Sequence, residues 1–362
     1  MQVACPTVGV LLATCEKPTA IRPLRTAPLM TTKRLDSRDG QVYVLPSTDP
    51  LWLAVRIAMT TGRPLLLRGD PGTGKSSLAA KVALDEKWRY YEHTVTPRTD
   101  GTDVLWTFDS ARRSAKASSN DSAPFEDYEF VEPGPLWWAF DRDQARFRGQ
   151  PRRRARDAYR NDQAEEPSRE LNSGRLDDGA VVLIDDIDKA GPDVPNGLLG
   201  ALGSGRFRVD ETGTDVELTE DMNVLVVITT NNERELPPAF ERRCIVHDLT
   251  PPSTDQLVAI ALAHAKHEGR SLTKVKKARV RRVAEKVTEL RAEARARKIR
   301  APGIAEFLDA VWACLDTGID PDGDQWESVQ SMTLAKDHRW DEPATPPTEA
   351  SRRRRAPSGQ SE

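Results

Sequence analysis

Short continuous apolar runs alternate with helical periodicity over the first two thirds of the chain. Residues 65–67, 180–184 and 224–228 are apolar runs of strand length. Such runs fit strands that are buried on both faces of a parallel sheet. Apolar residues recur on one face over 50–60, which predicts a helix before the first of these strands. Strands that alternate with helices predict a doubly wound, parallel α/β domain.

Weaker patterns predict the remaining elements of this domain. Residues 206–209 and 215–218 alternate around a Thr212-Gly213 turn, which is typical of a β-hairpin. The other expected segments are a short β-like stretch at 42–45, strands at 89–95 and 244–249, and helices at 78–84, 103–117 and 134–140.

After Pro251-Pro252 the pattern becomes purely helical. Helical periods recur over 255–268, 275–297 and 304–315, with no strand between them. We therefore expect an all-α domain over 251–317, preceded by the α/β domain over 39–250.

Three other segments lack a steady apolar period. Residues 1–38 and 318–362 are rich in polar residues and proline, which predicts a disordered arm and a disordered tail. Residues 142–179 are rich in Arg, Asp, Gly and Ser. They predict an exposed insertion in the α/β domain that is mobile at least in part.

The composition is that of a globular protein with a polar surface. The 362 residues are 30% charged and 38% hydrophobic, with a formal net charge of −3. No apolar run approaches the roughly 18 residues of a membrane span, so we expect a cytoplasmic protein without membrane association. The four cysteines match no metal-binding or CxxC spacing, which favours reduced thiols.

Basic residues cluster at 142–160, 274–300 and 352–355. A solvated helix face or an extended arm is the favoured interpretation of such clusters. Contact with the phosphates of a nucleic acid is the less favoured one.

The most informative motif follows the strand at 65–67. It has the form G-x-x-x-x-G-K-[ST] and precedes an Ala-rich helix, which is the context of a phosphate-binding P-loop. The N–H groups of such a loop point into one concavity at the positive end of the helix. Lys75 is placed to reach the β- and γ-phosphates of a nucleotide, and the Ser76 hydroxyl to ligate Mg²⁺. The predicted nucleotide-binding residues are Gly69, Asp70, Pro71, Gly72, Thr73, Gly74, Lys75, Ser76 and Ser77.

An acidic pair ends the strand at 180–184. Ligands of open α/β sheets bind at the carboxyl ends of the strands, so we expect Asp185 to hold Mg²⁺ opposite the P-loop. Asp186 is one residue further on, where a carboxylate can orient or polarise the attacking water.

Polar residues also follow the strand at 224–228. An amide at this strand end, from Asn231 or Asn232, can hydrogen-bond the attacking water or the γ-phosphate. Arg242 and Arg243 come after a turn. A guanidinium there can stabilise phosphate charge in a neighbouring subunit, as an arginine finger does.

Together these motifs resemble the AAA+ ATPases, specifically their MoxR-like branch. The resemblance covers about residues 41–316 and rests on Gly-Asp-Pro-Gly-Thr-Gly-Lys-Ser, Val-Leu-Ile-Asp-Asp-Ile-Asp-Lys-Ala and Ile-Thr-Thr-Asn-Asn-Glu-Arg-Glu-Leu-Pro-Pro-Ala-Phe-Glu-Arg-Arg. It implies ATP and Mg²⁺ as cofactors, and a P-loop AAA+ fold whose all-α domain is the lid. It also implies a homo-oligomeric ring, most often a hexamer, with ATP bound between subunits. Members remodel protein clients, often beside a partner that carries a von Willebrand factor A domain.

The resemblance also assigns roles to the later polar residues. It implies that Asn232 is the sensor-one residue, with Asn231 as the second choice. It implies that Arg243 is the arginine finger, with Arg242 as the neighbour that shares or replaces it.

Two departures from the family pattern affect the expected activity. The acidic strand normally ends in Asp-Glu, whereas this chain has Asp185-Asp186. Because a catalytic carboxylate that is one methylene shorter is displaced by about 1 Å, we expect slow turnover. Many family members have a sensor-two arginine directly after a proline at the start of a lid helix. In this chain Gly303 follows Pro302, and Arg300 is the nearest arginine that could substitute.

The sequence leaves three functions open. An ATP-driven protein remodeller is favoured. A nucleotide-gated switch or scaffold with little hydrolysis is favoured by Asp186, and a nucleic-acid-stimulated NTPase by the basic segments. The preference for ATP over GTP rests on the resemblance alone.

Overall fold

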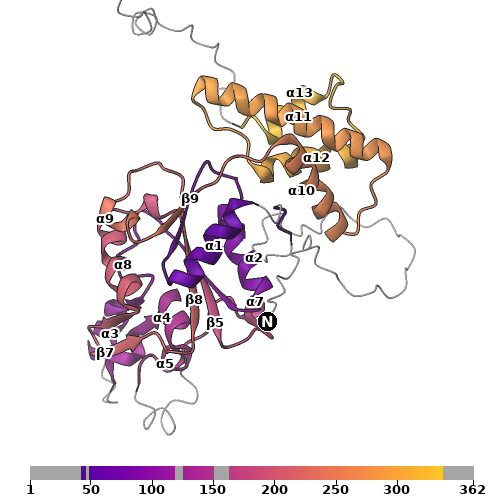
Figure 1. Ribbon diagram of the computed structural model, residues 1–362. Coiled ribbons are helices and arrows are strands. Elements are labelled where there is room, and N and C mark those ends of the chain that lie inside the picture. Colours follow the sequence, from indigo (N-terminus) through magenta and orange to yellow (C-terminus); the bar gives the residue numbers. More distant parts are fainter. Residues whose placement is uncertain (1–41, 46–48, 119–124, 151–162, 337–362) are drawn as a thin grey trace, which may run out of the picture. The chain divides into compact units, whose positions relative to one another are not determined.

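The computed structural model describes residues 42–45, 49–118, 125–150 and 163–336 (Figure 1). The described residues of 1–252 and 262–271 form one compact unit, here called the α/β unit. Those of 253–261 and 272–362 form a second, the helical unit. None of the helices in the described ranges is long and apolar enough to cross a membrane.

A five-stranded parallel sheet is the centre of the α/β unit. Its strand order is β2-β5-β8-β1-β9, and all four neighbouring pairs are parallel. The strands are β1 (Leu65–Arg68), β2 (Arg89–Thr94), β5 (Gly179–Asp185), β8 (Asn223–Thr230) and β9 (Ile245–Asp248). Every residue of β5 is buried, as its unbroken apolar sequence predicts.

Helices cover both faces of this sheet. Alternate strand residues enter two separate apolar clusters, because side chains point to opposite faces with a period of two. One cluster includes residues of α1 (Pro50–Thr61) and α2 (Lys75–Asp85). The other includes α4 (Pro135–Phe140) and α8 (Asp193–Ser204). The predicted doubly wound α/β fold is confirmed.

Smaller elements surround the sheet. Two antiparallel pairs are present: β3 (Trp106–Phe108) with β4 (Val131–Pro133), and the predicted hairpin of β6 (Arg206–Val209) with β7 (Thr214–Glu217). The remaining helices of the unit are α3 (Ser110–Ser118), α5 (Arg142–Arg146), α7 (Arg169–Asn172), α9 (Pro238–Glu241) and the 3₁₀ turns η1 (Asp127–Phe130) and η2 (Ile187–Lys189). The helix predicted over 103–117 begins only at Ser110, because β3 precedes it. Residues 42–45 form no strand.

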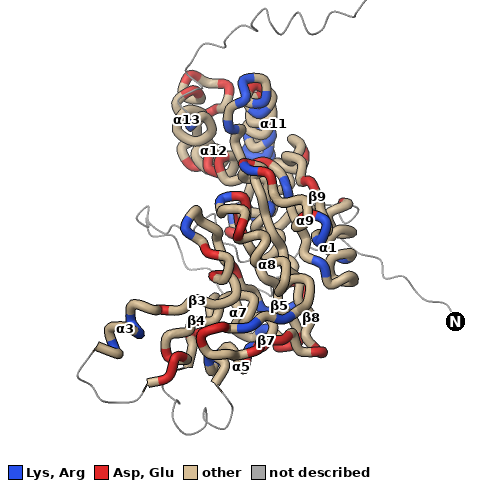
Figure 2. Tube along the Cα trace, turned by 90° about the vertical axis from the view of Figure 1, so that its left-hand side faces the viewer, with Lys and Arg blue, Asp and Glu red and all other residues tan. Residues whose placement is uncertain are grey.

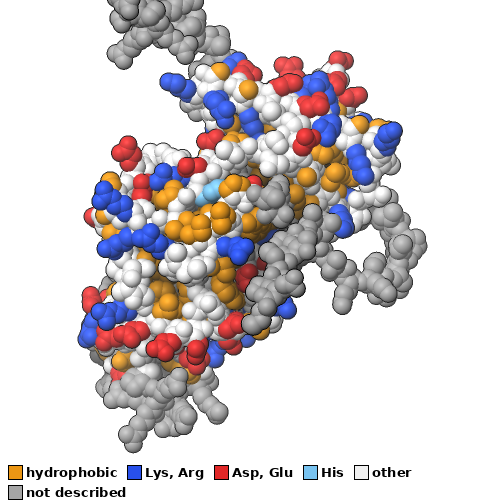
Figure 3. Space-filling model, in the orientation of Figure 1, with side chains coloured by type: hydrophobic (Ala, Val, Ile, Leu, Met, Phe, Trp, Pro, Cys, Tyr) orange, Lys and Arg blue, Asp and Glu red, His pale blue; other side chains and the backbone are white. Residues whose placement is uncertain are grey.

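The exposed side of α1 is partly apolar. The predicted inner face is buried through Leu51, Ala54 and their neighbours. Leu53 is 60% exposed, however, and Ile57 is also exposed, as is Val246 on β9. Figure 3 shows hydrophobic side chains gathered on the surface of the α/β unit over this region.

The described parts of 142–179 are not the exposed insertion that the sequence predicts. Ala145 and Ala164 are buried, and so is Arg148. Glu166 accepts hydrogen bonds from Arg89 on β2 (2.9 Å) and from Arg142 (2.8 Å). Glu166 therefore holds the segment against the sheet. The pairing of Glu166 with Arg89 joins residues that are distant in sequence, so the polar composition of the segment does not predict it. Residues 151–162 lie outside the described ranges.

The helical unit extends beyond its predicted end at residue 317. Its helices are α11 (Lys274–Arg297), α12 (Ile304–Thr317) and α13 (Trp326–Thr333), together with the first part of α10 (Thr254–His267), whose residues from Leu262 on belong to the α/β unit. Residues 318–336 were expected in a disordered tail, but Trp326 is buried and the Lys286 ammonium lies 5.5 Å from its ring centroid. The expected arm at 1–38 and the rest of the tail, 337–362, lie outside the described residues.

Basic residues line α11, as its sequence predicts (Figure 2). Several of them are neutralised within the helical unit. Arg282 donates to the carboxylate of Asp322 at 2.8 Å, and Arg281 donates to that of Asp255 at 2.9 Å. The solvated-face interpretation of this stretch therefore agrees with the contacts that these two arginines make.

Candidate nucleotide-binding site

The glycine-rich loop lies between β1 and α2, at the carboxyl end of its strand. Gly69, Gly72 and Gly74 all have positive φ, at 146°, 76° and 93°. A Cβ on Gly69 would stand 2.5 Å from the Leu249 carbonyl oxygen, so no larger residue fits this backbone without a shift. The loop thus has the close-approach geometry of an anion cradle at a helix N-terminus.

Lys75 is the first residue of α2, and its ammonium folds back over the loop. Nζ donates to the carbonyl oxygens of Gly69 (2.7 Å) and Asp70 (2.9 Å). It also donates to Oδ1 of Asn231, at 2.8 Å, beyond the end of β8. The loop and the strand end are therefore joined through one cation.

Two opposing effects act on the protonation of this lysine. Burial lowers the pKa of Lys75, since the charged form loses water. The nearby charges of Asp186, Asp185, Asp70 and Asp188 oppose that shift, because they favour the ammonium. This cluster of negative charge is where a cation, or a cation-bound phosphate, would be attracted.

Asp185 ends β5 and faces the first turn of α2. Its Oδ1 accepts hydrogen bonds from the Ser76 hydroxyl (2.6 Å) and from the Thr229 hydroxyl (2.7 Å). Thr229 also accepts from the backbone N–H of Asp186 at 2.8 Å. Sequence reasoning missed Thr229, although its place at the end of a strand beside β5 is a usable signal. Ser76 and Asp185 offer the hard oxygen ligands that Mg²⁺ prefers, so the donor set fits that ion.

Asp186 has the left-handed backbone conformation, with φ 61°. Its carboxylate accepts from Asn231 Nδ2 (2.8 Å) at one oxygen and from the Lys189 ammonium at the other. The hydrogen bond to Asp186 raises the pKa of Lys189. A continuous chain of contacts thus runs from Lys75 through Asn231 and Asp186 to Lys189.

Of the two asparagines, the one that was the second choice from the sequence contacts the P-loop lysine. Asn231 touches both Lys75 and Asp186, whereas the side chain of Asn232 is exposed. The reason is backbone geometry: β8 ends at Thr230, and Asn232 takes the left-handed conformation (φ 57°) that asparagine tolerates. Its N–H donates to the Thr230 hydroxyl at 3.0 Å, as in a tight turn. The side chain that contacts the P-loop lysine is therefore that of Asn231, the second choice from the sequence, and not that of Asn232.

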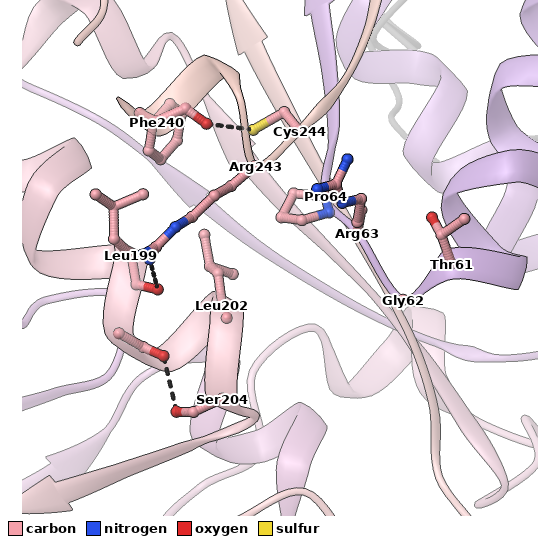
Figure 4. A pocket seen from close by; sticks show the side chains of 12 residues that line it. Thr61, Gly62, Arg63, Pro64, Leu199, Leu202, Ser204, Phe240, Arg243 and Cys244 are labelled. Atoms are coloured by element: carbon pink, nitrogen blue, oxygen red, sulfur yellow. Dashed lines mark hydrogen bonds between the residues drawn. The ribbon is translucent and has the colours of Figure 1, made fainter. Parts of the chain in front are cut away.

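The two arginines lie just before β9, at the amino end of that strand. Arg243 Nη1 donates to the Leu199 carbonyl at 2.8 Å, and Arg242 has an exposed side chain. Arg243 lines a pocket of about 630 Å³ in the α/β unit, shared with Arg63 and Pro64 (Figure 4). Because Pro64 directly precedes β1, this pocket lies at the amino ends of the parallel strands. The P-loop is about 15 Å away along β1, at roughly 3.3 Å per residue.

Arg300, the candidate for sensor two, lies in the helical unit. Its guanidinium donates to Glu306 Oε1 at 2.7 Å, and the other oxygen of Glu306 accepts from the Gly303 N–H at 2.8 Å. These contacts give Arg300 a local role at the start of α12.

Comparison with known families identifies the class of the protein. Residues 64–244 match the AAA domain, dynein-related subfamily, and this span is half of the chain. The chain belongs to this family, which makes it a P-loop ATPase of the AAA+ class, and the family as a whole binds nucleotide with Mg²⁺. Comparison with curated proteins finds no match.

Comparison with solved structures finds matches of low similarity. A "putative ATPase" from Cytophaga hutchinsonii is 14% identical, with 78% of this chain and 79% of that one covered and a TM-score of 0.36. The RuvB Holliday junction branch migration motor of Thermotoga maritima is 16% identical, with 75% and 70% covered and a TM-score of 0.34. At these scores neither likeness carries an argument about function.

The two asparagines provide a matched pair of substitutions. We expect Asn231→Ala to lower the rate of ATP turnover by about a hundredfold, because it removes a positioned hydrogen-bond donor. Asn232→Gly keeps the left-handed turn and should leave turnover within about twofold. Steady-state phosphate release from Mg–ATP measures both. An equal loss in the two variants would contradict the assignment of Asn231.

Proposed function

We propose that the protein is a MoxR-like ATPase that hydrolyses Mg–ATP between the subunits of a ring and uses the energy to remodel a partner protein. The observation that carries the proposal is the chain of contacts from the P-loop lysine through Asn231 to Asp186. It joins the phosphate cradle to the carboxylate that follows the buried strand, and catalysis of phosphoryl transfer depends on positioning of this kind.

The residues divide the work by position. Lys75 exchanges its bonds to the Gly69 and Asp70 carbonyls for bonds to the β- and γ-phosphates. Ser76 and Asp185 would hold Mg²⁺, which would neutralise charge on the phosphates. Asp186 and Asn231 orient the attacking water, and the carboxylate of Asp186 has acceptor positions beyond those it uses for its two partners.

Arg243 is proposed to act on the nucleotide of a neighbouring subunit. It lies just before the amino end of β9, whereas the P-loop of its own chain follows the carboxyl end of the adjacent strand β1, so we assign it to the nucleotide of another copy. A guanidinium from the next copy would stabilise the charge of the transition state. A closed ring, most often of six subunits, gives every site such a donor.

The client and the partner rest on the MoxR-like motifs. A partner with a von Willebrand factor A domain is part of this proposal, and so are the lid role of the helical unit and the cytoplasmic location. The contacts weaken the nucleic-acid alternative, because Arg142 and Arg148 of the basic segment form ion pairs with Glu166 and Glu132.

One observation favours a slowly hydrolysing switch as a second candidate. Both oxygens of Asp186 already have partners, Asn231 and Lys189, so the carboxylate is restrained before any water binds. If hydrolysis is slow for this reason, the binding of nucleotide, rather than its turnover, would switch the protein between its two states.

Mixing two inactive variants tests whether sites lie between subunits. Lys75→Ala and Arg243→Ala should each lose at least about 95% of ATP turnover. An equal mixture should recover roughly a quarter of the wild-type rate, since one site in four pairs an intact P-loop with an intact arginine. Phosphate release after subunit exchange is the measurement. No recovery in mixed oligomers would contradict the intersubunit site.

Substitution of Asp186 by Glu separates the two candidates. For a remodelling ATPase we expect turnover to change by less than about threefold, because the left-handed backbone of Asp186 would then already place the shorter carboxylate at the attacking water. The double substitution Asp186→Asn with Lys189→Met serves as the inactive control. A gain of about a hundredfold in Asp186→Glu would instead identify the natural protein as a switch.

A further inference from the structure

Asp188 is a buried carboxylate near the site that the proposed mechanism does not use. It lies in η2, two residues after Asp186, and is 2% exposed. No Lys, Arg or His within the described part of the chain forms an ion pair with it. Burial of a carboxylate is costly unless hydrogen bonds satisfy it.

Two backbone N–H groups beyond the end of β8 supply those hydrogen bonds. Oδ2 of Asp188 accepts from the N–H of Glu233 at 2.8 Å and from that of Asn231 at 3.2 Å. Hydrogen bonds to an ionised acceptor are stronger than those between neutral groups. One carboxylate oxygen thus holds the residues on both sides of Asn232.

Asn232 lies between these two donors. It has φ 57°, a left-handed conformation that asparagine tolerates, and the hydrogen bonds on both sides fix it there. With both ends of the turn held, the Asn231 side chain is directed to Lys75 Nζ and Asp186 Oδ1, each at 2.8 Å.

We propose that Asp188 is a positioning residue for hydrolysis, which acts by fixing the turn at 231–233 so that the Asn231 amide bridges Lys75 and Asp186. It acts through Asn231, since its carboxylate is buried and accepts hydrogen bonds from the backbone N–H groups of Asn231 and Glu233. The proposal rests on the role proposed above for Asn231.

Two substitutions of different chemistry test this role. Asp188→Asn retains an oxygen that can accept both N–H groups, whereas Asp188→Ala removes it. We expect Asp188→Ala to lower kcat for ATP about thirtyfold with KM within about threefold, and Asp188→Asn to stay within about threefold of wild type. Loss of nucleotide affinity with unchanged kcat in Asp188→Ala would overturn the proposal.

Hydrogen exchange of the nucleotide-free protein supplies a readout that does not depend on activity. The Asn231 and Glu233 amides should exchange at least about tenfold faster in Asp188→Ala and at the wild-type rate in Asp188→Asn. Asp188→Asn carries the test by itself where the alanine variant does not fold. If Asp188→Asn keeps this protection but loses turnover, the charge of Asp188 matters rather than its hydrogen bonds, and the proposal is overturned.

A double-mutant cycle separates this proposal from the one it rests on. In an Asn231→Ala background, Asp188→Ala should cause no further loss of kcat, because both changes act through one amide. A full additional thirtyfold loss would overturn the positioning role. If Asn231→Ala alone leaves turnover unchanged, the proposed role of Asn231 has failed, whatever Asp188 does.

Discussion

The parallel pairing of β5 with β8 determines where the polar groups of the site lie. The register sets Ile184 opposite Ile228, so Asp185, the last residue of β5, lies beside Thr229, the residue before the last of β8. Their hydroxyl–carboxylate bond at 2.7 Å is completely buried. Directly after the two strands end, Asn231 donates a hydrogen bond to the carboxylate of Asp186. A shift of the β5–β8 register by one residue would turn every side chain of the shifted strand to the opposite face and separate the residues of the site.

Charge balance is the second constraint. The strand end presents several carboxylates, and each is satisfied in a different way: Asp185 by hydroxyl groups, Asp186 by an amide and an ammonium, Asp188 by backbone N–H groups. Lys75 is the cation that stands between this acidic edge and the phosphate loop. A polyphosphate could not approach three carboxylates without such a cation and a bound metal, since like charges at short range repel strongly. Nucleotide binding at this site therefore depends on the balance of charges as well as on the shape of the loop.

The sequence predicted those elements whose residue types are restricted by burial or by backbone conformation. The apolar runs, the glycine-rich loop and the acidic strand end could be read directly, because burial and backbone approach restrict the residue types. The choice between Asn231 and Asn232 could not, since it depends on which residue takes the left-handed turn. Glu166 was missed as a partner of Arg89 because the two are far apart in sequence. The burial of Trp326 could not be predicted from its polar sequence neighbours, because it depends on the packing of α13 against α12 and on Lys286, which is distant in sequence.

The central claim is that the loop at 69–76 and the strand ends form one nucleotide site through Lys75. Calorimetric titration with Mg–ATP tests it most directly, on wild type and on Lys75→Ala, with circular dichroism as the control for folding. The account predicts saturable binding by the wild type and an affinity at least about a hundredfold lower in Lys75→Ala, because a buried charge-assisted contact to phosphate is lost. Equal affinity in the two folded proteins, or no binding by the wild type, would contradict it.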